Sequence, residues 1–184
     1  MNRISFFVPG VPRPGGSKTS NVIYKNGKPL MAKGTRRDGT SFERIVTATR
    51  EAGPHTASWR ADVKDFATKN YKGEPLIGPI ALVVTYVMPR SKGHYGSGRN
   101  AGRLKDSAPT FVEKAPDTTK LLRSLEDSLK GICWGDDSQV VGQIAEKVYG
   151  TKTGAHVDIV AIAPGTRNWL SAVVPILRER GVCL

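Results

Sequence analysis

The run from Ile80 to Met88 is the feature that most restricts what this chain can fold into. It is almost continuously apolar and rich in β-branched residues, and Pro89 ends it. A run of this length and composition is typical of a central strand that is covered on both faces. It is too short to cross a bilayer, and no segment approaches 18 consecutive apolar residues. The chain must therefore supply neighbouring strands and covering layers.

Hydrophobic periodicity and turn residues predict those other elements. Ile4 to Val8 indicates a first strand, and Asn26-Gly27 indicates a hairpin. This order predicts a single mixed β-sheet with packed helices, an α/β (α+β) domain over residues 1–163 with a helical extension over 164–184. We expect further strands over 140–148 and 157–163, and helices from 41 to the Gly53-Pro54 pair, over about 59–70, over 121–129 with Gly131 as its C-cap, and from 169 to 177 with Pro175 inside it.

The charge of the chain is strongly positive and unevenly distributed. The net charge is +12, from 28 Lys and Arg against 16 Asp and Glu. Residues 1–37 hold eight Lys or Arg and no acid, and residues 89–105 hold five and no acid. Blocks of one sign attract a polyanion through counterion release. A solvated surface is the plainer alternative, and an RNA or ribosomal partner would also explain the charge. A membrane surface is disfavoured because no basic amphipathic helix is present.

Cysteine usage and the amino terminus indicate the compartment. Cys133 and Cys183 are too far apart for a zinc-binding pair, and they make no disulfide framework. Cys133 is most simply a small buried apolar residue. The first apolar run is too short for a signal peptide. We therefore expect a soluble, cytoplasmic protein, and the glycine-rich basic segment 89–110 to be a long, flexible, functional loop.

Acidic residues are scarce, yet several gather around one predicted helix. Asp117 precedes the leucine-patterned run and would suit a helix N-cap. Thr119, Arg123 and Asp127 recur at four-residue intervals, where the last two would form an ordinary surface pair. The Asp136-Asp137 pair stands at the turn into the next strand and would return to the same helix end. Carboxylates that converge there would repel one another unless a cation lay between them.

Such a site suits Mg²⁺, which takes oxygen ligands and commonly binds one or two carboxylates together with phosphate. An ion of this kind can activate water for an in-line displacement. No other constellation competes with it. The histidines are scattered, and the chain has neither a serine nucleophile elbow nor a phosphate-binding loop of the Walker type.

Three segments carry a specific resemblance: Lys114 to Arg123, Leu125 to Gly131 and Trp134 to Val141. Together they resemble the RusA-type Holliday junction resolvases, which are small, dimeric, Mg²⁺-dependent endonucleases that are frequently phage-encoded. Residues 7–12 and 16–18 resemble the amino-terminal segments of phage members, and residues 89–96 resemble a loop of those members. The resemblance therefore spans about residues 4–148. It implies a homodimer that resolves branched, four-way DNA by paired nicks, with Mg²⁺ or Mn²⁺ as cofactor and no small-molecule cofactor.

The resemblance also implies roles for individual residues. Asp117 matches the first metal-binding aspartate and Asp137 the later catalytic one, with Asp136 as a neighbouring ligand. Arg123 stands where the family has a catalytic lysine, and it keeps the positive charge. Thr119 replaces a second metal-binding aspartate. The residues that we expect to contact DNA are Arg13, Lys18, Arg90, Lys92, Arg99, Arg103 and Lys120.

The replacement at Thr119 leaves two interpretations open. A hydroxyl is a weak Mg²⁺ ligand, and it removes one negative charge from the site. The site is then either a natural variant with a rearranged set of ligands or an inactivated nuclease. In the second case the protein would be a junction-binding module with weakened or lost activity.

Overall fold

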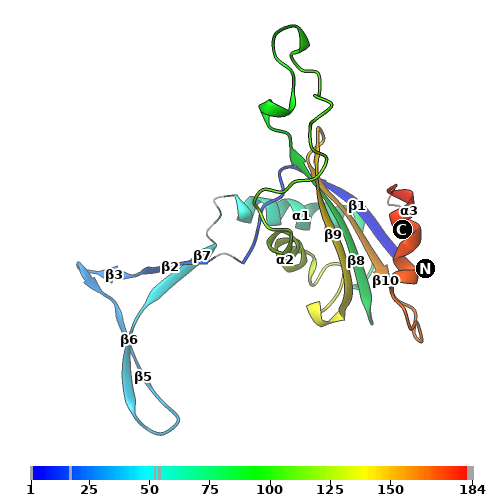
Figure 1. Cartoon of the computed structure of the whole chain (residues 1–184). Helices are drawn as coiled ribbons and strands as arrows, with labels where there is room; N and C mark the ends of the chain where they lie inside the picture. Colours follow the sequence, from blue (N-terminus) through cyan, green and yellow to red (C-terminus); the bar gives the residue numbers. More distant parts are fainter. Residues whose placement is uncertain (1, 17, 52, 54, 182–184) are drawn as a thin grey trace.

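The structure is a computed structural model that describes residues 2–16, 18–51, 53 and 55–181, without the side chains of residues 18, 19, 50 and 51. Its body is one four-stranded mixed sheet with helices on both faces (Figure 1). The strand order is β1-β10-β8-β9, with bounds β1 (Arg3–Pro9), β8 (Ile80–Pro89), β9 (Val140–Gly150) and β10 (Gly154–Ala161).

The predicted central strand is confirmed. β8 lies between β10, to which it pairs antiparallel, and β9, to which it pairs parallel. Its alternating residues enter two separate cores. Leu82 and Tyr86 belong to the larger core under two helices, whereas Val83 belongs to the smaller core on the opposite face. Burial on both faces explains why the run has no polar alternation.

Two helices cover one face, and the third covers the other. α1 (Thr56–Asn70) and α2 (Thr118–Leu129) pack together over the sheet, and α3 (Leu170–Glu179) lies behind it (Figure 1). The leucine pattern of α2 is buried as predicted, and Gly131, at a φ of +79°, follows its last turn. Cys133 is fully buried, and burial raises the pKa of its thiol to about 12. No helix in the described ranges is long and apolar enough to cross a membrane.

The helix predicted from residue 41 is wrong, because this segment forms strands of a branched β-arm. Residues 18–51 leave the body as an arm of three paired sections (Figure 1). The residues from Ile45 to Thr49 are mostly β-branched and favour strands, and the segment preceding Asp38 supplies the pairing partners. The sections are β2 (Lys18–Val22) with β7 (Thr47–Glu51), β3 (Tyr24–Lys25) with β4 (Lys28–Pro29), and β5 (Met31–Thr35) with β6 (Ser41–Ile45).

The basic segment 89–110 forms a second projection, which we call the finger (Figure 1). It contains η1 (Lys92–His94) and η2 (Gly98–Asn100). Its two limbs are joined by backbone hydrogen bonds, from Gly96 N to Arg103 O at 2.9 Å and from Lys105 N to His94 O at 3.0 Å. The finger is therefore an irregular hairpin with its own internal bonding.

A buried ion-pair network attaches α3 to the sheet. Asp158 on β10 is 1% exposed, and its Oδ1 lies 2.8 Å from Nε of Arg3. Arg180, directly after α3, pairs with the other carboxylate oxygen and donates to the Thr85 hydroxyl at 2.9 Å. The C-terminal segment is thus tied to the domain by charge as well as by its apolar face.

We expect Asp158→Asn to lower the free energy of unfolding by about 3 kcal/mol, because it leaves two guanidinium groups without their buried counter-charge. Urea denaturation measures this loss. Glu179→Gln is the matched control, since Glu179 pairs with the same Arg3 but is 59% exposed, and it should cost less than about 1 kcal/mol. Equal losses in the two variants would contradict the assignment.

Candidate functional site

Asp117 stands at the N-cap position of α2, but its side chain does not cap the helix. The carboxylate is 62% exposed, and its Oδ2 lies 3.2 Å from Nζ of Lys120. The Asp117 side chain therefore does not form the N-cap hydrogen bond that the sequence suggested. The positive end of the helix dipole still favours a carboxylate here. Asp117 thus presents an accessible anionic group at the start of the helix.

The backbone around Asp117 is held by neighbouring elements. Lys147 on β9 donates from Nζ to the carbonyl oxygens of Lys114 at 3.0 Å and Pro116 at 2.8 Å. The amide of Gly15 donates to Lys120 O at 2.8 Å. Sequence reasoning missed Lys147. Its spacing of four residues from Gln143, which puts both on the same strand face, is the signal that could have found it.

Arg123 lies on the exposed side of α2, beside the connector between β1 and β2. A Cβ on Gly16 would come within 3.1 Å of Arg123 Cδ, and one on Gly15 within 3.1 Å of Ser124 Cα. The two glycines therefore allow the connector to lie against the helix. The surface pair suggested for Arg123 with Asp127 is replaced by a pair with α1, since Asp127 Oδ2 lies 2.6 Å from Arg60.

Asp136 and Asp137 lie in the turn around η3 (Asp137–Gln139). Asp136 Oδ1 accepts from the amide of Ser138 at 3.0 Å, and the Gln139 side chain accepts in return from the amide of Asp136 at 2.9 Å. Lys130 Nζ lies 2.7 Å from Asp136, and this contact holds the pKa of that carboxyl well below its usual range. Asp136 is therefore largely engaged in shaping the turn.

Asp137 makes longer contacts than Asp136, although the Asp136 side chain is the more exposed of the two, at 61%. Its Oδ1 accepts from the buried Trp134 Nε1 at 3.2 Å, its Oδ2 is 3.7 Å from Lys130, and the side chain is 44% exposed. Glu126 on α2 is a neighbour that sequence reasoning missed. Burial, and then the charge of Asp137, raise the pKa of Glu126. Its position two helical turns after Thr119 is the signal that could have found it.

Asp117 and Asp137 do not meet within one chain. Asp117 begins α2, whereas Asp137 lies beside Lys130 at its end, and a rise of 1.5 Å per residue separates these ends by about 20 Å. The expectation that the turn returns to the start of α2 is therefore wrong. Among the described residues no three His, Cys, Asp or Glu are grouped as metal ligands. The carboxylates suit a hard cation, but one chain alone does not bring them together.

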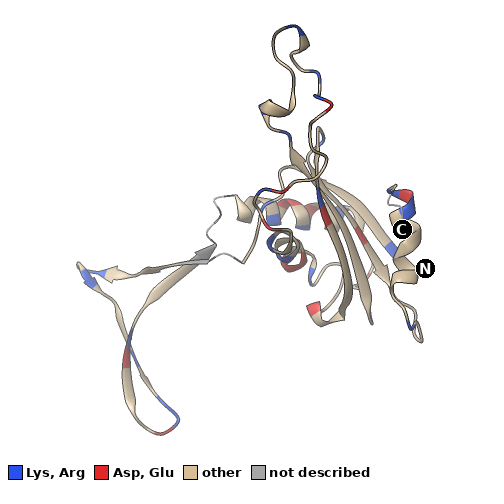
Figure 2. Ribbon diagram, viewed as in Figure 1, with Lys and Arg blue, Asp and Glu red and all other residues tan. Residues whose placement is uncertain are grey.

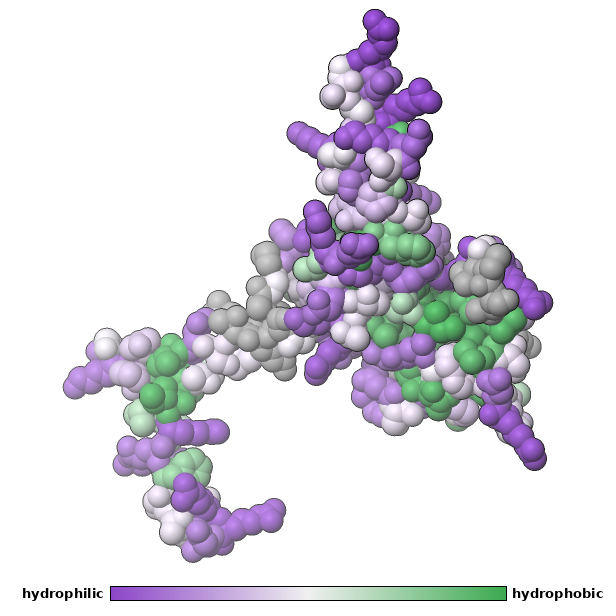
Figure 3. Space-filling view, viewed as in Figure 1, coloured by the Kyte–Doolittle hydropathy of each residue, from purple (hydrophilic) through white to green (hydrophobic). Residues whose placement is uncertain are grey.

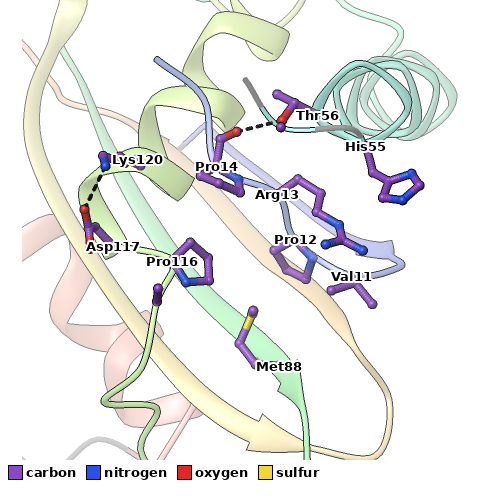
Figure 4. A pocket seen from close by; sticks show the side chains of 12 residues that line it. Val11, Pro12, Arg13, Pro14, His55, Thr56, Met88, Pro116, Asp117 and Lys120 are labelled. Atoms are coloured by element: carbon purple, nitrogen blue, oxygen red, sulfur yellow. Dashed lines mark hydrogen bonds and ion pairs between the residues drawn. The ribbon is translucent and has the colours of Figure 1, made fainter. Parts of the chain in front are cut away.

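A cavity of about 400 Å³ opens beside Asp117. Figure 4 shows it between the connector from β1, the start of α1, the end of β8 and the start of α2. Arg13 and Lys120, both expected to bind DNA, line it together with Asp117. The side chains that surround it are Val11, Pro12, Arg13, Pro14, His55, Thr56, Met88, Pro116, Asp117 and Lys120.

The remaining basic residues differ in their surroundings. Lys92, Arg99 and Arg103 are exposed on the finger. The ribbon of the finger carries several basic positions (Figure 2), and its surface is mostly hydrophilic (Figure 3). Arg90 instead donates to Pro109 O at 2.8 Å and to a carbonyl of β9, so it braces the base of the finger. The side chain of Lys18 lies outside the described residues.

The structure is a mixed α/β domain with exposed carboxylates and two basic projections. The family model of endodeoxyribonuclease RusA matches residues 29–160, and the chain belongs to this family. Membership implies endodeoxyribonuclease activity of the Holliday junction resolvase type, on branched DNA. Nucleases of this type generally use a divalent metal ion. No curated protein matches the chain.

Proposed function

We propose that the protein is a Mg²⁺-dependent, structure-selective endodeoxyribonuclease that resolves four-way DNA junctions by paired nicks, acting as a homodimer. One observation carries this proposal: Asp117 and Asp137 are exposed at opposite ends of α2, in a chain whose net charge is +12. Exposed carboxylates are unfavourable neighbours for DNA unless a cation lies between them and the phosphate.

A dimer would bring the separated carboxylates together. Two copies with their α2 helices antiparallel about a two-fold axis would set Asp117 of one copy near Asp137 of the other, and they would do so twice. Two such sites, related by symmetry, fit two strands that are nicked in pairs.

The outer edge of β9 offers a surface for such pairing. Among the described residues, the backbone hydrogen bonds on this outer edge lie only near Lys147 and Tyr149. Val141, on the same strand, is 51% exposed. α2 runs antiparallel to β9, because Lys147 contacts Pro116 whereas Gln143 contacts Glu126. Antiparallel pairing of two β9 edges would therefore align the two α2 helices as the composite site requires.

In this arrangement Asp117 of one copy and Asp137 of the other would hold the ion, with Asp136 assisting. A divalent ion supplies neutralisation of phosphate charge and a water of lowered pKa. The exposed guanidinium of Arg123 would bind the phosphate and stabilise negative charge that develops on it. It would not serve as a proton donor, because an arginine stays protonated.

The two projections would engage the arms of the junction. Lys92, Arg99 and Arg103 on the finger stand away from the body, and the arm carries basic residues toward its two ends (Figure 2). Contacts of this kind position the protein on the phosphate backbone without reading sequence. We therefore expect binding to weaken steeply with salt.

Thr119 supports a second candidate, a junction-binding module that retains the fold without the nuclease. It is exposed on α2, two residues after Asp117, and adds no charge where the family has an aspartate. A cleavage assay on a labelled four-way junction, titrated with Mg²⁺ and Mn²⁺, separates the candidates. Binding without product under either ion would favour the module.

Thr119→Asp should raise the Mg²⁺-dependent cleavage rate about tenfold, since an added carboxylate strengthens ion binding by roughly 1.4 kcal/mol. The rate is measured at sub-saturating Mg²⁺ under single-turnover conditions. Thr68→Asp, an exposed threonine of α1, is the matched control and should leave the rate unchanged. The same rate in Thr119→Asp as in the parent protein would remove Thr119 from the metal site.

A further inference from the structure

The cavity beside Asp117 has two kinds of lining. Its walls are apolar and conformationally stiff: Pro12, Pro14 and Pro116 surround the hollow, with Met88 at its base (Figure 4). Met88 is only 7% exposed, so the base of the hollow belongs to the body of the protein. Charged and polar side chains complete the lining. Arg13 and Lys120 contribute cations, Asp117 contributes a carboxylate, and His55 lies beside Arg13.

This division matches the chemistry of a nucleotide, which joins a flat, weakly polar base to an anionic phosphate. A volume of about 400 Å³ lies in the range of small-ligand sites. Unstacked bases are held in proteins by flat or apolar side chains, while arginine and lysine bind the adjoining phosphate. The combination favours a nucleotide over a peptide, which would also require backbone partners along the walls.

We propose that this cavity receives one unstacked base of the bound DNA, next to the phosphate at which Asp117 acts. The inference rests on the proposed function and adds the way in which the substrate is recognised. Asp117 and Lys120 line the cavity itself. A base seated there therefore leaves its own phosphate at the start of α2, within reach of both side chains.

The same cavity provides selectivity for branched DNA. Extrusion of a base costs least where stacking and pairing are already weakened. When the arms of a junction are held apart, base pairs at the point of strand exchange lose a stacking neighbour on one side, whereas base pairs within a duplex keep both. A site that requires an extruded base thus acts at branch points and spares the arms.

The test uses the full-length protein and four-way junctions that carry 2-aminopurine at successive positions around the crossover, with Ca²⁺ in place of Mg²⁺. Stacking against neighbouring bases quenches the fluorescence of 2-aminopurine. Binding should raise its fluorescence severalfold at one position adjacent to the cleaved phosphate, and should leave positions within the arms unchanged. Fluorescence that does not rise at any crossover position would overturn the proposal.

Filling the cavity provides the second measurement. Val11→Trp places a large side chain in the hollow, and Ile77→Trp, at a site that is 94% exposed, is the matched control. The Val11→Trp variant should cleave an intact junction about tenfold more slowly than the parent protein. It should cleave as fast as the parent protein when the nucleotide that would be extruded is abasic. A slowing of the same size on the abasic junction would overturn the proposal, because no base then competes for the cavity.

The outcomes separate this inference from the nuclease assignment. Cleavage without brightening would refute the base site and keep the nuclease. An increase in 2-aminopurine fluorescence without cleavage under Mg²⁺ or Mn²⁺ would support the base site and refute the proposed nuclease activity. Failure to bind junctions would refute both proposals.

Discussion

Asp137→Asn should reduce junction cleavage by about a thousandfold while leaving junction binding within about threefold of the parent protein. The substitution keeps the size of the side chain and its acceptor for Trp134 Nε1, but it removes the charge that would bind the ion. Loss of about 4 kcal/mol of stabilisation at the reacting phosphate corresponds to this factor. Single-turnover cleavage in Mg²⁺ and gel-shift binding in Ca²⁺ measure the two effects separately.

Asp65→Asn is the matched control for this variant. Asp65 is an exposed aspartate of α1 that pairs with Lys69 at 2.6 Å, so it makes the same change of charge away from the site. It should leave both cleavage and binding unchanged. Cleavage by Asp137→Asn at the parent rate would show that Asp137 is not a metal ligand and would remove the central support for the proposed nuclease site.

Two inactive variants should regain activity when they are mixed. In a composite site, a dimer of one Asp117→Asn copy and one Asp137→Asn copy contains one site with both substitutions and one with neither. Random exchange makes half of the dimers mixed, so about a quarter of all sites should be intact. We expect strong nicking of one strand from the mixture, against almost none from either variant alone.

The gel pattern makes this complementation specific. Mixed dimers should produce nicked junctions with few paired cuts, because each holds a single intact site. Mixing either variant with itself after the same exchange treatment provides the background. If the mixture stays inactive although exchange is verified with differently tagged copies, the two aspartates belong to one subunit and the antiparallel arrangement of the α2 helices is wrong.

Local pattern predicted the body of the fold well, for an identifiable reason. Most residues from Ile80 to Met88 and the leucines of α2 are buried, so their composition reflects the faces that they cover. The segment from residue 41 was mispredicted because its apolar residues lie on an exposed ribbon, where Ile45 is 48% exposed. Spacing there does not report a buried face, and pairing with residues 18–35 decides the structure.

The same distinction between local sequence and tertiary packing applies to the candidate site. The sequence by itself determined which chemical groups are present: scarce carboxylates at Asp117 and Asp137, a threonine where the family has an aspartate, and basic segments on either side. These follow from residue identity and local context.

Only the tertiary structure decided where those groups lie. It separated the two aspartates along α2, engaged Asp136 and Arg90 in bracing contacts, and brought Lys147 and Glu126 to the site. It also assembled the cavity beside Asp117 from four segments that are distant in sequence. The physical reason is that distances between side chains depend on the packing of whole elements, which no local spacing along the chain encodes.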